Sequence, residues 1–162
     1  MNSTDFTYRL CNADDFDVWK DLNLAFMQEE IQDEDLWNSP DTEDVDTWKR
    51  TFEEALQSED MIRLVLFEVD GVPVGFANIM IIYSVWTHGK AAVLDDLYLV
   101  PEIRGKSYGR QAMHFAEEIA TKSNCKRLQF QSEGTNPNAK AFYQAIGFQP
   151  AEMNFYVKYF NG

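Results

Sequence analysis

The feature that most constrains the fold is the stretch MIRLVLFEVDGVPVGFANIMIIYS, residues 61–84. Two apolar segments rich in β-branched and aromatic residues flank Asp70-Gly71, a dipeptide typical of tight β-hairpin turns. The stretch therefore predicts two long antiparallel strands. A doubly wound dinucleotide-binding fold is excluded, because that fold joins its early strands through helical crossovers instead of hairpins.

The other segments place this hairpin in a mixed α/β order. Apolar alternation predicts further strands over residues 6–12, 91–100, 126–132 and 154–160. Helical spacing predicts helices over residues 13–28, 42–57, 107–122 and 136–147. The order is then β-α-α-β-β-β-α-β-α-β, and the late strand-helix-strand crossover implies one parallel pair. The length fits a single domain over residues 1–162.

The charge balance limits the classes of partner. A net charge of −13 argues against a nucleic-acid partner, which needs clustered Lys and Arg. It is compatible with a cationic substrate, although a solvated acidic surface would give the same balance. One early segment holds many of the acidic residues: Glu29, Glu30, Asp33, Glu34, Asp35, Asp41, Glu43, Asp44 and Asp46. This segment bears on function only if it borders a site.

The chain also carries signals about its surroundings. No apolar run approaches the roughly 18 residues of a membrane span, and the N-terminal residues lack the order of a signal peptide. Cys11 and Cys125 lie far apart without metal-ligand spacing. We expect free thiols, a cytoplasmic location, no membrane partner and no metal.

The stretch RGKSYGRQAM joins a predicted strand to a predicted helix that begins near Ser107. Unpaired amides and the positive end of the helix dipole meet there, and Gly105 and Gly109 would let a ligand approach the backbone. The basic residues are Arg104, Lys106 and Arg110. A pyrophosphate suits this turn, while a plain glycine-containing connection capped by serine is the alternative. The spacing matches neither a Walker loop nor GxGxxG.

A second motif, NPNAKAFYQAIGF, covers residues 136–148. Together the two motifs resemble the GCN5-related N-acetyltransferase (GNAT) superfamily. Its first motif, Arg/Gln-x-x-Gly-x-Gly/Ala, corresponds to residues 104–109, with Ser107 where glycine is most common. Its second, Asn-x-x-Ala-x-x-Phe-Tyr-x-x-x-Gly-Phe, corresponds to residues 136–148. The resemblance implies a GNAT-like α+β fold with a mostly antiparallel twisted sheet of about six or seven strands and about four helices.

The resemblance also implies acetyl-coenzyme A as co-substrate. Main-chain groups of the strand before the turn would serve the pantetheine arm and the acetyl carbonyl, the turn would serve the pyrophosphate, and the second motif would close the opposite side. The implied cofactor-binding residues are Leu97, Tyr98, Leu99, Arg104, Gly105, Lys106, Ser107, Tyr108, Gly109, Arg110, Asn136, Ala139 and Tyr143. The backbone amide of Ser107 should still serve the pyrophosphate, and its hydroxyl could cap the helix.

Two residues are candidates for catalysis. Tyr143 matches the motif position of a general acid, since a phenol can protonate a departing thiolate; its apolar helical stripe also fits a core tyrosine. The stretch around Asp95 resembles the diamine and polyamine acetyltransferase branch, which implies that Asp95 orients the amine and helps remove its proton. Asp96 is the alternative, because neighbouring residues of a regular strand face opposite sides. Either carboxylate would also suit a surface salt bridge.

The acceptor side is less defined by the sequence. Trp86 resembles a substrate-side tryptophan of the same branch, although a packing role is equally compatible. Glu29 and Glu30 would lie beside the substrate entrance and favour cations. The expected function is N-acetyl transfer to a primary amine of a small cationic, polyamine-like acceptor by direct attack in a ternary complex. The alternatives are an aminoglycoside, amino-acid or protein N-terminal acetyltransferase, or a non-catalytic acyl-coenzyme A-binding module.

The C-terminal aromatic residues raise a question of assembly. These residues are Phe155, Tyr156, Tyr159 and Phe160. They would suit either a subunit interface of a homodimer or a strand within the chain, and alternation alone does not distinguish the two.

Overall fold

The hairpin expected at Asp70-Gly71 lies within one five-stranded sheet of order β1-β2-β3-β4-β5. The computed structural model describes residues 5–30, 44–132 and 137–160. The strands are β1 (Phe6–Leu10), β2 (Ile62–Val69), β3 (Val72–Ser84), β4 (Gly89–Leu99) and β5 (Cys125–Phe130). Neighbouring strands from β1 to β4 are antiparallel, and β4 and β5 are parallel. The predicted mixed, mostly antiparallel sheet is confirmed.

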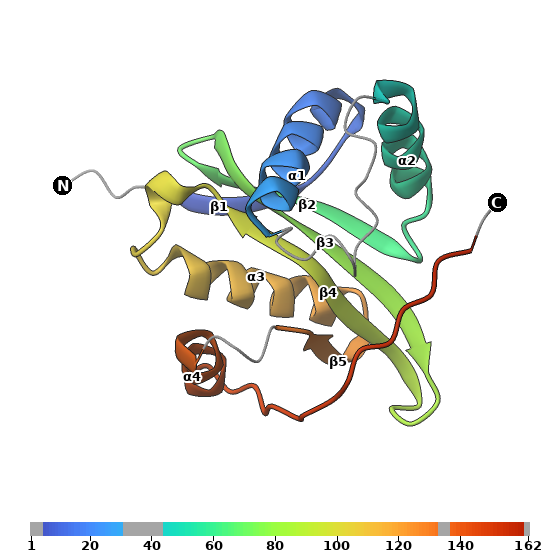
Figure 1. Ribbon diagram of the computed structural model, residues 1–162, viewed down its shortest axis with the longest axis vertical. Coiled ribbons are helices and arrows are strands. Elements are labelled where there is room, and N and C mark those ends of the chain that lie inside the picture. The colour runs from blue at the N-terminus through green and yellow to red at the C-terminus, as the bar shows by residue number, and fades with distance from the viewer. Residues whose placement is uncertain (1–4, 31–43, 133–136, 161–162) are drawn as a thin grey trace.

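The helices cover both faces of this sheet. They are α1 (Phe16–Glu30), α2 (Val45–Gln57), α3 (Tyr108–Lys122) and α4 (Pro137–Ala145), with short 3-10 helices η1 (Ala13–Asp15) and η2 (Pro101–Ile103). Figure 1 shows α1 and α2 on one face and α3 and α4 on the other. This arrangement follows the crossover predicted from the sequence, because α3 connects the parallel strands β4 and β5.

The turn between β2 and β3 has the geometry that its sequence predicts. Asp70 and Gly71 have φ values of 50° and 80°, so both central residues are left-handed as in a type I′ turn. Val69 pairs directly with Val72 across it. The twist of this turn type matches the twist of the flanking strands, which explains why the dipeptide was informative.

Strand β2 is buried on both of its faces. Val65 and Phe67 join the cluster that packs against α3. Leu64 and Leu66 join the clusters beneath α1 and α2. This double burial explains the unbroken apolar run LVLF in the sequence.

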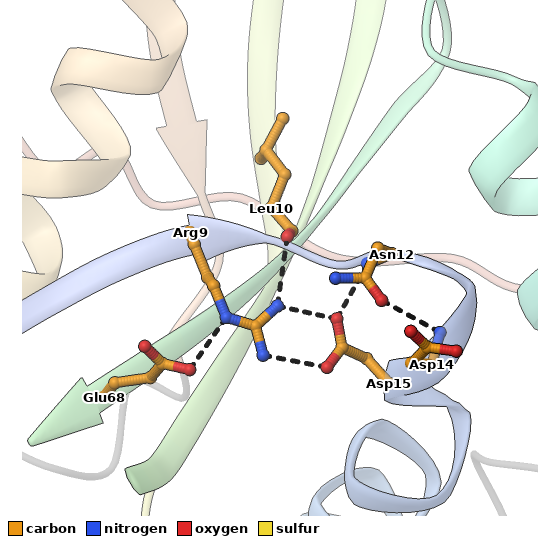
Figure 2. A network of polar contacts seen from close by, with 6 residues as sticks. All are labelled: Arg9, Leu10, Asn12, Asp14, Asp15 and Glu68. Atoms are coloured by element: carbon orange, nitrogen blue, oxygen red, sulfur yellow. Dashed lines mark hydrogen bonds and ion pairs between the residues drawn. The ribbon is translucent and has the colours of Figure 1, made fainter. Parts of the chain in front are cut away.

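The start of α1 is fixed to the sheet by a polar network (Figure 2). The Arg9 guanidinium donates to both carboxylate oxygens of Asp15, at 2.7 and 2.8 Å, and to Glu68 of β2 at 2.8 Å. Asp15 also accepts a 2.7 Å hydrogen bond from the backbone N–H of Asn12. The contact with Arg9 lowers the pKa of the Asp15 carboxyl. The network sets where α1 crosses the sheet, and α1 forms one side of the site described below.

The closing strand predicted over residues 154–160 is wrong. Residues 149–160 have no regular secondary structure and are exposed, so the described chain has five strands rather than six or seven. Alternating apolar residues favour an extended backbone, but a strand also needs a neighbouring strand to pair with. In the part of the chain that the structure describes, only β4 pairs with β5.

Candidate active site

The candidate site lies where β4 and β5 separate. The two strands pair as far as Leu94 with Phe130, and no described strand pairs with β4 beyond that point on this side. On its other side β4 continues to pair with β3, as far as Leu99 with Gly75. Among the described residues, one edge of residues 95–99 therefore has no strand partner and is an open edge of the kind that an extended ligand can pair with.

A β-bulge occurs at this point of separation. Leu94 pairs with Ile79 and Asp96 with Asn78, so Asp95 is an extra residue in β4. Leu94 and Leu97 both pack into the cluster beside α3, although three positions separate them. The expectation that the side chains of Asp95 and Asp96 face opposite sides of a regular strand is therefore wrong. The sequence LDDLY has no local pattern that predicts a bulge.

The side chain of Asp96 faces α1 through a buried polar network. Its Oδ2 accepts a 2.9 Å hydrogen bond from the amide nitrogen of Asn78. The same nitrogen donates to Asn23 Oδ1 at 3.1 Å, and Asn78 Oδ1 accepts from Trp19 Nε1 at 3.2 Å. Asn23 in turn donates to the Trp19 carbonyl at 2.7 Å. Since the indole can only donate, it fixes which way the Asn78 amide points.

Sequence reasoning missed this network. Asn78 lies within the apolar run GFANIMII, and Asn23 and Asn78 are only 4% and 7% exposed. A buried amide costs free energy unless it is hydrogen-bonded, so an Asn inside an apolar strand was a usable signal. Its partners were not readable, because Asn23 and Asn78 are 55 positions apart.

The two carboxylates have different proton affinities. Burial raises the pKa of Asp96 to about 6, against the opposing effect of the Asn78 hydrogen bond, and the negative charge of Asp95 adds to the rise. The side chain of Asp95 is exposed, but the neighbouring protein atoms still desolvate it enough to raise its pKa. Asp96 therefore titrates close to neutral pH, which suits a group that accepts and returns protons.

The glycine-containing turn follows directly after the open edge. Gly105 and Ser107 have φ values of 80° and 35°, so both are left-handed. A serine in this conformation is strained where glycine would not be, which explains the preference for glycine at this motif position. The Ser107 hydroxyl does not cap α3; it accepts a 3.3 Å hydrogen bond from the Gln111 side chain.

Several cations surround the turn and the start of α3. Lys106 and Arg110 are exposed and have no ion-pair partner among the described residues. Arg104 differs, because its guanidinium contacts the carboxylate of Glu29 at 2.6 and 2.9 Å. The structure thus brings together Glu29 and Arg104, which the sequence had assigned to different ligands.

Tyr143 lies beside the point where the strands part. Its ring centroid is 4.5 Å from that of Phe130, the last residue of β5 to pair with β4. Tyr143 is half-buried and packs with the cluster beside α3, whereas Phe142 of the same helix is 37% exposed. Ala139 is half-buried on the same helix, and Asn136 lies outside the described residues.

Two predicted acceptor-side residues are less informative. Trp86 is 93% exposed in the turn between β3 and β4. Asp95 lies six positions along β4 from Gly89, which is beside that turn, and this corresponds to roughly 20 Å. The structure does not bring Trp86 to the two carboxylates. Glu30 ends α1.

Elsewhere among the described residues, neither a surface hollow nor a metal-ligand cluster competes with this site. A surface hollow at Leu56–Met61 lies at the end of α2 and includes none of the candidate residues. Over residues 5–30, 44–132 and 137–160, no three His, Cys, Asp or Glu side chains are grouped to hold a metal ion. None of the helices in these ranges is both long and apolar enough to cross a membrane.

Comparisons with known proteins agree with this geometry. A mouse thialysine N-epsilon-acetyltransferase is 30% identical over 76 residues, which are 47% of this chain and 44% of that protein, so the match spans less than half of the relative. The crystal structure of a possible acetyltransferase from Clostridium difficile 630 superposes with a TM-score of 0.77 at 20% identity, covering 97% of this chain and 99% of the other.

A further structure has the same fold and holds a ligand. The aminoglycoside N-acetyltransferase AAC(6')-Iy in complex with CoA superposes with a TM-score of 0.71 at 20% identity, covering 98% of this chain and 97% of that one. The family model described as Acetyltransferase (GNAT) family matches residues 20–148, which include both motifs and the open edge of β4. The chain belongs to the acetyltransferase (GNAT) family.

Proposed function

We propose that the protein transfers an acetyl group from acetyl-coenzyme A to a primary amine of a small cationic, polyamine-like acceptor, by direct attack in a ternary complex. The observation that carries the proposal is the open edge of β4 over residues 95–99, which leads directly into the left-handed turn before α3. An extended arm and an anionic end group fit such an edge and turn in that order.

The cofactor assignment rests on the shape of the turn. Main-chain groups of residues 97–99 would hold the pantetheine arm, and the amides of residues 105–110 would hold the pyrophosphate with Lys106 and Arg110. A Cβ at Gly105 or Gly109 would meet no atom within 4 Å, so the backbone there is accessible to a ligand. Ala139 and Tyr143 would close the opposite side with Asn136. The bound thioester supplies an activated acyl carbonyl and a thiolate leaving group.

The chemistry requires the ammonium nitrogen to lose two protons and the departing thiolate to gain one, so one proton is released overall. An alkyl ammonium has a pKa of about 10.4, so it must lose a proton before its nitrogen can attack. Asp95 would orient the ammonium, and the carboxylate pair of Asp95 and Asp96 would accept its proton, directly or through water. The nitrogen–carbon bond would then form and the carbon–sulfur bond would break. The phenol of Tyr143 would protonate the thiolate, and the phenolate would regain its proton from the nitrogen of the new amide.

The acceptor class is inferred from charge and from relatives. The net charge of −13 and the acidic residues near Glu29 and Glu30 favour a cation. The mouse relative is named for thialysine and the structural neighbour for aminoglycosides, both of which carry amines. An aminoglycoside, an amino acid or a protein N-terminus is the second choice of acceptor. We further infer a reducing, cytoplasmic setting, since Cys11 and Cys125 are free thiols.

A thiol-release assay tests this function. The purified protein would be given acetyl-coenzyme A with polyamines, aminoglycosides, amino acids and peptides, and free coenzyme A would be followed over time. We expect the highest kcat/KM with a polyamine. Thermal stabilisation by coenzyme A without thiol release from any amine would instead indicate a binding module, and a preference for a neutral acceptor would contradict the proposed substrate class.

A further inference from the structure

We propose that Glu29 is a positioning residue for the cofactor turn, acting through Arg104, and is not a ligand of the amine. This inference rests on the proposed function, because it assigns the turn to coenzyme A. Arg104 Nη1 lies 2.6 Å from Glu29 Oε1, and Nη2 lies 2.9 Å from Oε2. The pair is therefore bidentate, the geometry in which an arginine and a carboxylate fix each other's orientation.

Arg104 is also held from the side of β4. Its Nε donates a 2.9 Å hydrogen bond to the Leu99 carbonyl, and its guanidinium lies 5.4 Å from the centre of the Tyr98 ring. Tyr98 is 7% exposed and packs against Phe26 of α1 at 5.7 Å between ring centroids. One guanidinium thus joins the end of α1, the end of β4 and the start of the turn.

These contacts leave Glu29 poorly suited to bind an ammonium group. Both of its carboxylate oxygens contact Arg104, and this contact lowers the pKa of Glu29. A cationic acceptor would have to displace a guanidinium that makes two charge-assisted hydrogen bonds. At the turn, Lys106 and Arg110 remain as the exposed cations without an ion-pair partner among the described residues.

The position of the pair explains how it would affect the cofactor. Gly105 follows Arg104 directly, and its left-handed φ of 80° begins the turn. Movement of Arg104 would therefore displace the amides that we assign to the pyrophosphate. The side chains of Arg104 and Glu29 are 42% and 39% exposed, so the effect should be modest and should weaken with salt.

The test compares cofactor affinity with acceptor kinetics in Glu29→Gln. We expect calorimetry to show coenzyme A binding about twofold to fivefold more weakly than in the unaltered protein, with a smaller difference at high salt. The KM for a cationic amine at saturating acetyl-coenzyme A should stay unchanged. Asp21→Asn is the matched control, because it removes one charge from an exposed position of the same helix and should change neither quantity.

A double-mutant cycle isolates the coupling. Arg104→Gln should also weaken coenzyme A binding, and adding Glu29→Gln to it should produce no further loss. Additive losses would overturn the inference, as would an unchanged affinity for coenzyme A in Glu29→Gln, whether or not the amine KM rises. A raised amine KM with unchanged cofactor affinity would leave the proposed function intact. Failure of the unaltered protein to bind coenzyme A would contradict both this inference and the proposed function.

Discussion

At the scale of single residues, Asp95 and Asp96 show how strongly the local environment changes the exposure and the pKa of two neighbouring aspartates. Asp95 is exposed at the bulge, whereas Asp96 is half-buried against Asn78 and α1. The pKa of Asp96 is raised to about 6 because burial penalises its charged form. The folded protein therefore bears an electrostatic cost at neutral pH that it would not bear with a neutral side chain.

The variant Asp96→Asn should raise the free energy of unfolding at pH 8. A folded-state pKa near 6, against 3.8 as the ordinary value, means that stability is highest below pH 4 and falls as the pH rises through 6. Asn keeps an acceptor for Asn78 and avoids the charge, so we expect a gain of about 1–3 kcal/mol at pH 8. Urea unfolding at pH 4, 6 and 8 measures this.

The comparison variant is Asp95→Asn, which should also raise stability at pH 8 but by less than Asp96→Asn, because Asp95 is the more exposed of the two carboxylates. The gain from Asp96→Asn should be much smaller at pH 4 than at pH 8, because at pH 4 the carboxyl is protonated in the folded state and only partly ionised in the unfolded state. A gain that is equal at pH 4 and pH 8 would contradict the electrostatic explanation.

Tyr143→Phe tests the proposed general acid. The ring packing against Phe130 is preserved in this variant, and only the hydroxyl is lost. We expect turnover to fall by about 100-fold, the scale of one lost proton-transfer group, while coenzyme A affinity measured by calorimetry changes little. Equal turnover in the two proteins would leave Tyr143 as a packing residue.

At the scale of elements, the open edge of β4 depends on how closely β3 approaches it. Gly75 pairs with Leu99 at the end of the β3–β4 ladder. A Cβ at this position would collide with the Tyr98 carbonyl oxygen and would approach Leu99 Cδ2 to 2.7 Å. The absence of a side chain at Gly75 therefore helps to set the path of the strand that we assign to the pantetheine arm.

Gly75→Ala should lower both stability and cofactor affinity. The added methyl group must displace the β4 backbone, so we expect a loss of about 2 kcal/mol or more in the free energy of unfolding and weaker coenzyme A binding. Chemical denaturation and calorimetry measure the two effects. Unchanged stability would show that β4 can move away without cost.

Gly109→Ala is the matched comparison within α3. A Cβ there meets no atom within 4 Å, and alanine favours the helix by about 0.5–1 kcal/mol. Stability should therefore stay equal or rise. Coenzyme A binding should change little, because the family motif accepts alanine as well as glycine at this position; a large loss would show that the methyl group blocks the approach to the turn.

At the scale of the whole molecule, the C-terminal segment leaves large apolar side chains exposed. Exposed fractions are 49% for Phe155, 86% for Tyr156, 46% for Tyr159 and 87% for Phe160. Grouped apolar side chains on a surface favour association. We therefore propose a homodimer in which this segment contributes to the interface.

The double variant Tyr156→Ser with Phe160→Ser should shift the protein from dimer to monomer, since it removes the two most exposed aromatic side chains of this segment. Sedimentation velocity at micromolar concentration measures the change. Tyr83→Ser, at the 74% exposed Tyr83 of β3, is the control and should remain dimeric. If the unaltered protein is a monomer in this measurement, the proposed homodimer is wrong.

Local patterns were sufficient for much of the fold. The type I′ turn at Asp70-Gly71 and the apolar stripe of α3 depend on neighbours within a few positions. The strand–helix–strand crossover followed from the order of these locally predicted elements. The strand predicted over residues 154–160 failed for the opposite reason. Its alternation was present, but pairing requires a partner that no local pattern specifies.

The residues of the site divide in the same way. By itself the sequence determined the turn before α3, the helix that carries Tyr143 and the two adjacent carboxylates, because short motifs encode backbone conformation. Only the tertiary structure decided that Asp95 is an extra residue in β4, that Asn78 holds Asp96, and that Glu29 contacts Arg104 from 75 positions away. Such contacts depend on how α1 crosses the sheet, and that crossing is set by packing and by the Arg9 network across the whole chain.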